Sequence, residues 1–178
     1  MLAFLEGIVI YQGEEQIIVD VGGIGYEVFY GKKVPIGNKV ALFTALIIRE
    51  NSQVLYAFDS LRERNFFYLL LKVKGIGPKL AFGLLTSLGI EIISGAIRRE
   101  DISVFMTVSG VGKKSASQII LDLKDAPLAS TDDLLAEVLM ATKALGIEEE
   151  KVISIYQKLV SDNLSSSEVV KMVLQRIN

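Results

Sequence analysis

The fold is decided by VSGVGKKSASQIIL, residues 108–121, because most of this stretch occurs twice in the chain. The segment VKGIGPKLAFGLL, residues 73–85, matches VSGVGKKSASQII, residues 108–120, at an offset of 35 positions. Both copies contain a valine, a Gly-hydrophobic-Gly turn, a lysine two positions after the second glycine, an alanine and a later hydrophobic residue. No third copy follows another 35 residues on. The repeat is therefore a pair and not a solenoid array.

Each copy predicts a helix, a tight hairpin and a second helix, with the glycines at the turn. Ile76 and Val111, the hydrophobic residues between the glycines, are expected to turn inward and hold the hairpins. The second helix begins with backbone N–H groups that have no partner within the helix, so its N-terminus is a potential anion site. The turn glycines, which permit positive φ and close approach to the backbone, are Gly75, Gly77, Gly110 and Gly112.

Three lysines lie where these second helices are predicted to begin: Lys79 in the first copy, and Lys113 and Lys114 in the second. A cation at a helix N-terminus opposes the helix dipole at a cost of about 0.3–1 kcal/mol, and a bound phosphate would reverse that sign. The alternative is that they are solvated surface lysines. Because lysine recurs at matching positions of two copies, we favour phosphate binding.

The second copy is similar to a nucleotide-binding loop, but its spacing excludes one. A P-loop reads G-x-x-x-x-G-K-[ST] after a strand. Here Thr107 replaces the first glycine, Lys114 replaces the Ser or Thr, and a helical segment precedes. GGIG, residues 22–25, runs into the strand-like YEVFY and not into the helix that dinucleotide binding requires. Two anion sites on one pair of units suit successive phosphates of a nucleic-acid backbone, which position a protein without reading sequence.

Ahead of the repeat, residues 1–58 read as short β-rich runs separated by turns. The runs are GIVIY, QIIVDV, YEVFY, KVALFTALII and QVLYAF. Five strands in so short a segment predict an OB-fold barrel, a fold that often binds nucleic acids or sugars. The alternative is a β-domain used only for assembly, and fold alone does not choose between the two. The periodicity becomes helical at Leu61, which places a domain boundary near Arg62.

The composition removes many kinds of enzyme. The 178 residues include no cysteine and no histidine, which excludes disulfides, zinc sites built on thiolate or imidazole, cysteine nucleophiles and histidine-based triads. The lack of cysteine fits a reducing cytosol, so we expect a cytoplasmic protein. We also expect that it holds no metal or cofactor. The net charge of −2 hides a basic segment, because residues 63–125 hold 9 basic and 6 acidic residues. Local charge sets the potential that a polyanion meets.

One window is apolar enough to be considered for a membrane. LAFGLLTSLGIEIISGAI, residues 80–97, carries Glu91 as its single charge and approaches the length of a bilayer span. Gly83, Gly89 and Gly95 are expected to break it into short buried helices. The N-terminal MLAFLEGIVI lacks a basic region and meets a glutamate early, so it is expected to be the first strand and not a signal peptide.

The two copies resemble tandem helix-hairpin-helix motifs. A single such motif is shared by glycosylases, ligases and polymerases. The ordered set of barrel, tandem motifs and helical tail is more specific, and it resembles the RuvA family of bacterial Holliday-junction branch-migration proteins. The resemblance covers essentially the whole chain. It rests on GGIGYEV, RENSQVLYAF, RERNFFYLLLKVKGIGPKLA, VSGVGKKSASQIILDLKD and ALGI.

The resemblance implies four segments: an OB-fold barrel over residues 1–62, a tandem helix-hairpin-helix domain over 63–125, a linker over 126–131 and a three-helix, UBA-like domain over 132–178. Thr131 or Asp132 can cap the first tail helix, and Gly146 can end it. SSSE, residues 165–168, predicts the start of the third. The linker APLAST spans at most about 20 Å when extended, which is short for a freely moving tail.

The resemblance also implies a function without catalysis by this chain. Family members form a homotetramer, or an octamer, that holds four-way junction DNA during recombination and repair of DNA damage, including the SOS response. The hexameric AAA+ ATPase RuvB pulls the DNA arms, and the resolvase RuvC can join. The glycine hairpins of the family grip the minor-groove backbone, a role that falls by position on Gly75, Gly77, Lys79, Gly110, Gly112, Lys113 and Lys114.

Two further sites follow from the resemblance, each with a departure. The family has an acidic pin of two adjacent carboxylates on a barrel hairpin, and the matching positions are Glu50 and Asn51, so one carboxylate is missing here. The alternative for Glu50 is an ordinary turn residue. The ATPase-binding turn of the tail corresponds to Leu145, Gly146 and Ile147, with isoleucine where the family often has an aromatic residue.

A DNA repair enzyme is the alternative function. A glycosylase needs a catalytic Asp or Lys in a base-sized pocket. The nearest candidate is Asp101, which REDISVF predicts to be a helix cap. A nuclease needs clustered carboxylates for Mg²⁺. EEE, residues 148–150, is expected to begin a helix in the acidic tail and to favour its dipole.

Overall fold

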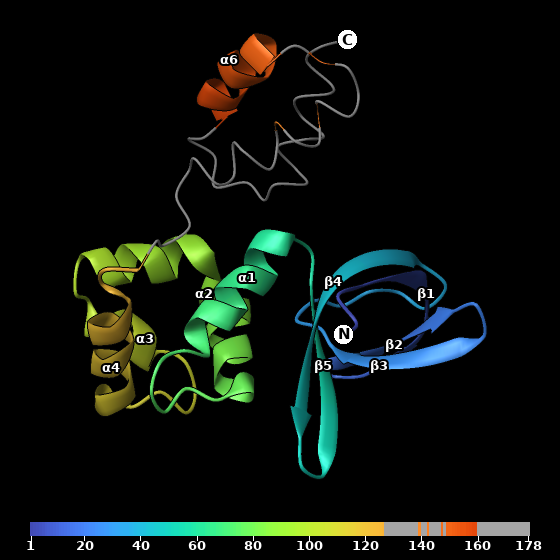
Figure 1. Cartoon of the computed structure of the whole chain (residues 1–178), viewed down its shortest axis with the longest axis horizontal. Helices are drawn as coiled ribbons and strands as arrows, with labels where there is room; N and C mark the ends of the chain where they lie inside the picture. The colour runs from blue at the N-terminus through green and yellow to red at the C-terminus, as the bar shows by residue number, and fades with distance from the viewer. Residues whose placement is uncertain (127–138, 140–141, 143–146, 148, 160–178) are drawn as a thin grey trace. The chain divides into compact units, whose positions relative to one another are not determined.

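The computed structural model divides the chain into two compact units, Met1–Lys124 and Asp125–Asn178. It describes residues 1–126, 139, 142, 147 and 149–159. The first unit contains a β-barrel followed by a layer of helices (Figure 1). These two parts confirm the predicted OB-fold barrel and tandem helix-hairpin-helix arrangement.

The barrel consists of β1 (Phe4–Gln12), β2 (Gln16–Val21), β3 (Ile24–Phe29), β4 (Lys39–Arg49) and β5 (Ser52–Phe58). The strands close in the order β1-β2-β3-β5-β4. The β3–β5 pair is parallel and the other pairs are antiparallel. Alternate residues point inward, so Leu5, Val9, Ile17 and Val19 fill the core. Each of the five predicted β-rich runs overlaps one strand.

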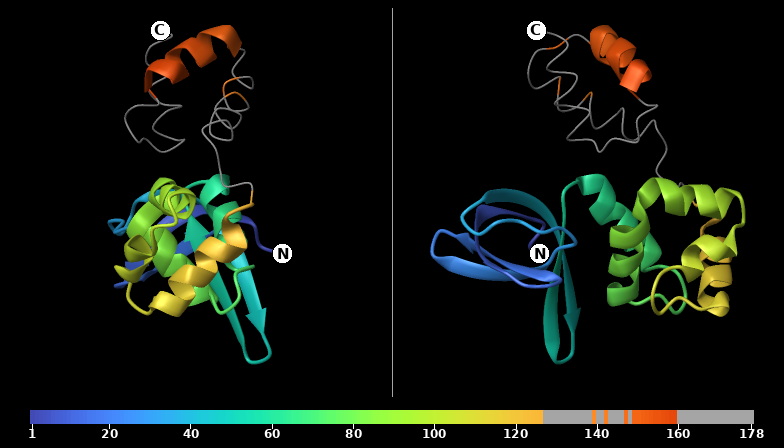
Figure 2. Two further views of the ribbon diagram at one scale, coloured as in Figure 1. Left: turned by 90° about the vertical axis from the view of Figure 1, so that its left-hand side faces the viewer. Right: turned by 180° about the vertical axis from the view of Figure 1, so that it is seen from behind.

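The β4–β5 hairpin is longer than the barrel requires. Its two strands pair from Phe43 opposite Phe58 to Arg49 opposite Ser52. The hairpin therefore extends away from the barrel, as two directions of view agree (Figures 1 and 2). Glu50 and Asn51 form the turn at its tip, and both are exposed.

The helical layer consists of α1 (Leu61–Leu70), α2 (Pro78–Arg98), α3 (Ile102–Met106) and α4 (Lys113–Leu123). Gly89 interrupts α2 with φ 75° and ψ 165°, so the apolar window is two shorter helices that meet at a kink. By length and composition α2 alone among the described residues could cross a membrane, but 56% of its apolar window is buried in the protein. The prediction of breaks at Gly83 and Gly95 was wrong. A glycine inside a helix costs only about 1 kcal/mol, which packing can offset.

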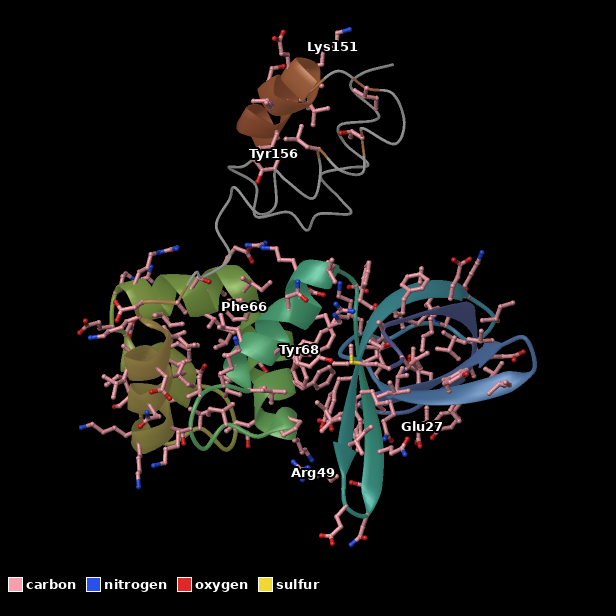
Figure 3. The ribbon with its side chains drawn as sticks, viewed as in Figure 1. Glu27, Arg49, Phe66, Tyr68, Lys151 and Tyr156 are labelled. Carbon is pink, nitrogen blue, oxygen red and sulfur yellow. The ribbon has the colours of Figure 1, made fainter. Side chains whose placement is uncertain are left out.

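A cluster of aromatic rings joins the barrel to the helices. The Tyr56 ring of β5 lies 5.1 Å from Phe67 of α1 and 5.2 Å from Phe82 of α2, measured between ring centroids. Phe58 lies 5.1 Å from Phe67. In Figure 3, Phe66 and Tyr68 mark the two sides of α1, one toward the other helices and one toward the barrel. The barrel and the helical layer therefore share a core and form one compact unit.

The chain enters α1 through a reciprocal cap. Ser60 Oγ accepts the Glu63 N–H at 3.1 Å, and Glu63 Oε2 accepts the Asp59 N–H at 3.0 Å. Asp59 also accepts a hydrogen bond from the Tyr30 hydroxyl and pairs with Lys32. Burial, with Asp59 beside it, raises the pKa of Tyr30. The cap fixes the direction in which the helical layer leaves the barrel.

The second unit is described mainly by α6 (Glu149–Leu159). Val152 and Tyr156 of this helix are buried. The prediction that residues 148–150 begin a helix holds for Glu149 and Glu150, whereas Glu148 lies outside the described residues. The other predicted tail helices, their caps at Thr131 or Asp132 and residues 165–168, and most of the linker also lie outside them.

Candidate nucleic-acid interface

The sequence repeat is also a structural repeat. The first motif consists of α1, the first hairpin (residues 71–77) and the start of α2; the second consists of α3, the second hairpin (residues 107–112) and α4. In the first motif, backbone N–H groups bond from Val73 to Leu70 O at 3.1 Å, from Ile76 to Val73 O at 3.1 Å and from Ala81 to Gly77 O at 2.9 Å. In the second, they bond from Val108 to Phe105 O at 3.1 Å, from Val111 to Val108 O at 3.0 Å and from Ala116 to Gly112 O at 2.9 Å. The two hairpins thus have the same backbone.

The two glycines of each hairpin have different roles. Gly75 and Gly110 both have φ 86°, a conformation that a side chain would strain. Gly77 and Gly112 have extended φ of −88° and −89°, so positive φ holds only for the first glycine of each pair. A Cβ added to Gly77 or Gly112 would meet no atom within 4 Å. The second glycines therefore leave open space in front of the helix N-termini.

The residues between the glycines behave as predicted. Ile76 and Val111 are 5% and 6% exposed, because both turn into the core of the helical layer. Each buried side chain holds its hairpin against the helical layer, while the glycines on either side stay exposed. The exposed edge of each hairpin is therefore backbone, without side chains that would hold a ligand at a distance.

Each hairpin leads into a helix whose first N–H groups lack a side-chain cap. Pro78 begins α2 and has no N–H, so the first donor there belongs to Lys79; Lys113 and Lys114 begin α4. All three lysines are exposed, which confirms their predicted place at the helix N-termini. Uncapped N–H groups beside lysines can hold a phosphate oxygen through charge-assisted hydrogen bonds.

The two hairpins lie next to each other. The Leu80 Cδ1 atom, in the first turn of α2, lies 3.5 Å from the position of a Cβ on Gly110. Both hairpins lie at the end of the helical layer toward which the β4–β5 hairpin also extends (Figures 1 and 2). The two candidate phosphate sites and the candidate pin residues Glu50 and Asn51 therefore face the same side of the unit.

A groove of about 790 Å³ runs between the hairpins and the barrel. Its helical wall includes Lys79 and Ser109, and its barrel wall includes Glu14 and Glu15. No pattern in the sequence indicated that these two glutamates would lie opposite a lysine. The groove therefore has one basic and one acidic wall.

Tyr56 also lines this groove and lies near charges of both signs. Burial raises the pKa of Tyr56; Arg49 opposes this rise and Glu15 adds to it. Figure 3 shows Arg49 near the tip of the β4–β5 hairpin, on the side that faces the helical layer. Arg49, in the last pair before the turn, thus supplies a positive charge next to the exposed Glu50.

The remaining candidates are placed as follows. Asp101 Oδ1 accepts the Ser103 N–H at 3.1 Å and the Ser103 hydroxyl at 2.5 Å, bonds that hold the pKa of Asp101 below its usual value. Asp101 is thus the predicted cap, here of α3. Within the described residues no group of three or more acidic side chains could hold a metal ion. Leu145 and Gly146 lie outside the described residues, and the Ile147 N–H donates to Thr142 O at 3.2 Å.

Comparison with known proteins agrees with this geometry. The family described as RuvA N terminal domain matches residues 1–57, and the family described as SAM-like Helix-hairpin-helix tandem matches residues 67–125. Three relatives bear the name Holliday junction branch migration complex subunit RuvA. The protein of Tolumonas auensis is 30% identical over 205 aligned positions, covering 98% of each chain. That of Idiomarina loihiensis is 29% identical over 206 positions, covering all of both. That of Escherichia coli is 30% identical over 202 positions, covering 98% of each. The chain belongs to the RuvA family.

Proposed function

We propose that this chain is the DNA-binding subunit of a Holliday-junction branch-migration complex. The observation that carries the proposal is the pair of hairpins with the same backbone, each ending in an uncapped, lysine-bearing helix N-terminus on one side of the unit. The relatives are named as subunits of such a complex. The chain binds four-way junction DNA as a structural scaffold and does not catalyse a reaction itself.

Each subunit holds two points on the DNA backbone. The helix N–H groups and the lysines bind phosphates, while Gly75 and Gly77, like Gly110 and Gly112, let the sugar-phosphate chain approach the backbone. None of these contacts reads a base edge, so recognition depends on the shape of the DNA and not on its sequence. The proposed DNA-binding residues are Gly75, Gly77, Lys79, Gly110, Gly112, Lys113 and Lys114.

Glu50 and Asn51 are proposed to form the pin at the crossover of the junction. Their place at the tip of the extended β4–β5 hairpin supports this role. With one carboxylate, the pin repels phosphates less strongly than a pin with two.

The assembly is proposed to be a homotetramer, or an octamer made from two tetramers, in the cytoplasm. A RuvB-type AAA+ ATPase docks on the tail at Leu145, Gly146 and Ile147, and a RuvC-type resolvase joins the complex. The energy of ATP thus enters through a partner. We propose the domain division at residues 1–62, 63–125, 126–131 and 132–178 for this arrangement.

The chain is shorter than its alignment with a relative. The alignment with the Idiomarina loihiensis protein has 206 positions against 178 residues here, so at least 28 positions have no counterpart in this chain. Because the predicted linker APLAST, residues 126–131, is short, the ATPase is proposed to work close to the DNA-binding unit.

The alternative of a DNA repair enzyme is not favoured. Asp101 is occupied as a helix cap, and the relatives are named as branch-migration subunits and not as glycosylases or nucleases. Of the three glutamates at 148–150, Glu149 and Glu150 begin α6.

The test compares a synthetic four-way junction with linear duplex of equal length in a gel-retardation titration. The junction should bind more tightly, and binding should fall as salt rises. Replacing Lys79, Lys113 and Lys114 together by glutamate should abolish the complex without changing the thermal unfolding of the protein. Mass measurement in solution, with and without the junction, should give a tetramer or octamer. Equal affinity for junction and duplex would overturn the proposal.

A further inference from the structure

The first hairpin is held by a residue of the second motif. Asp122 lies in the last turn of α4, and its Oδ2 atom accepts the backbone N–H of Lys74 at 3.1 Å. Its Oδ1 atom accepts a hydrogen bond from Gln118 Nε2 at 2.7 Å, one helical turn earlier. Gln118 thus fixes the carboxylate in the orientation that reaches the first hairpin.

This bond has no equivalent in the other half of the repeat. At the repeat offset of 35 residues, Lys74 corresponds to Ser109 and Asp122 corresponds to Ser87. In the described part of the chain these two serines form no hydrogen bond with each other. The second hairpin is therefore held by its own backbone bonds and Val111, while the first has an additional tie to α4.

Electrostatics alone does not favour an aspartate at this place. A carboxylate near a helix C-terminus opposes the dipole of α4. It also puts a negative charge beside the first hairpin, which lowers the attraction of that hairpin for a phosphate. The gain from Asp122 must therefore lie in the charge-assisted hydrogen bond to the hairpin backbone.

We propose that Asp122 is a positioning residue for DNA binding, an inference that rests on the proposed function. By holding the Lys74 N–H, it fixes the first hairpin relative to α4 and so sets the spacing between the two phosphate sites of a subunit. Two sites on one rigid unit bind successive phosphates without an additional ordering cost, whereas a hairpin free to shift loses this advantage.

The sign of a substitution separates this role from that of a plain surface charge. Removing a surface carboxylate near a DNA site should strengthen binding to a polyanion. Asp122→Ala should instead weaken junction binding by about tenfold, the cost of one charge-assisted hydrogen bond. Asp122→Asn removes the charge but keeps an oxygen that accepts the Lys74 N–H, so it should bind at least as tightly as the unmodified protein.

Asp125→Ala is the matched control. Asp125 is an exposed carboxylate three residues further on, and among the described residues it has no hydrogen-bond or ion-pair partner. Its removal should leave junction affinity unchanged or raise it. The measurement is the dissociation constant for a fluorescent four-way junction at several salt concentrations, with thermal unfolding of every variant.

A double-mutant cycle locates the effect. Asp122→Ala combined with Lys79→Ala should lower the binding free energy for the junction by less than the sum of the two single effects. The reason is that both residues act on the first phosphate site. Combined with Lys114→Ala, which acts on the second site, the losses should add. A loss in Asp122→Ala that couples equally to both lysines would overturn the assignment.

Hydrogen exchange gives a readout that needs no DNA. The Lys74 amide should exchange faster in Asp122→Ala than in the unmodified protein, and Asp122→Asn should restore its protection. If Asp122→Ala does not fold, Gln118→Ala, which frees the carboxylate, should show the same two effects at smaller size. Unchanged exchange at Lys74, or Asp122→Ala binding as tightly as Asp125→Ala, would contradict the proposal. Failure of the unmodified protein to prefer the junction would instead refute the proposed function.

Discussion

The two motifs have the same backbone but different surroundings. Both have a first glycine at φ 86° and a second glycine before an uncapped helix. The first motif has proline and one lysine at the start of its helix, with Asp122 holding its hairpin; the second has two adjacent lysines and no such tie. The turn geometry is thus fixed by glycine and an inward hydrophobic residue, whereas charge and attachment vary independently.

The largest difference between the motifs should appear when their lysines are removed. At about 0.1 M salt one phosphate contact contributes roughly tenfold to affinity. Lys113→Ala with Lys114→Ala should therefore weaken junction binding about a hundredfold and lower the salt slope by about 2, and Lys79→Ala about tenfold and by about 1. Dissociation constants measured from low to moderate salt test this. Equal losses in the two motifs would show that charge does not distinguish them.

Substitution of the second glycine should have a similar effect on junction binding in the two motifs. Gly77→Ala and Gly112→Ala each place a methyl group in open space before a helix N-terminus, where it obstructs a phosphate. Each should lower junction affinity by about tenfold, with the unfolding free energy changed by less than about 0.5 kcal/mol. Titration with junction DNA and chemical denaturation measure the two quantities.

Gly75→Ala and Gly110→Ala are the matched controls for this prediction. At φ 86° an alanine is strained, so each should lose about 1–2 kcal/mol of unfolding free energy, by a similar amount in both motifs. The prediction is contradicted if Gly77→Ala and Gly112→Ala destabilise the protein as much as these two variants do.

A smaller effect on junction affinity is expected when the acidic wall of the groove is neutralised. Glu14→Gln with Glu15→Gln removes the negative charges opposite Lys79, and should raise junction affinity about two- to threefold at low salt, with the gain vanishing as salt screens it. Glu27→Gln, an exposed carboxylate of β3 that does not line this groove, is the control. An equal gain in the control would mean that only net charge matters.

The smallest effect concerns a residue that belongs to neither hairpin. Burial raises the pKa of Glu63 above its ordinary value of 4.5, and the Asp59 charge adds to the rise. The folded state then binds the proton more tightly than the unfolded state, so the unfolding free energy falls as pH rises from the unfolded pKa through the folded pKa. Glu63→Gln keeps an acceptor for the Asp59 N–H and should remove this fall. Denaturation from about pH 4 to pH 7 tests it, since parallel curves for the two proteins would contradict it.

Sequence patterns predicted the parts of this molecule that depend on local rules. Alternating apolar residues mark the strands, and the repeated glycines mark hairpins that only glycine can form without strain. Patterns could not predict contacts made by tertiary folding. Nothing in the sequence indicates that Asp122 reaches the Lys74 N–H, or that Glu14 and Glu15 face Lys79. The breaks expected at Gly83 and Gly95 were wrong because burial of the helix offsets the weak preference of a single glycine.

The aromatic cluster has a mechanical consequence. Tyr56, Phe67 and Phe82 join the barrel to the helices through packed rings and not through a flexible connection. Under the proposed function, a force on DNA held at the hairpins is therefore transmitted through these packed rings to the β4–β5 hairpin. Under the proposed function, this subunit stays fixed while the partner ATPase moves the DNA past it.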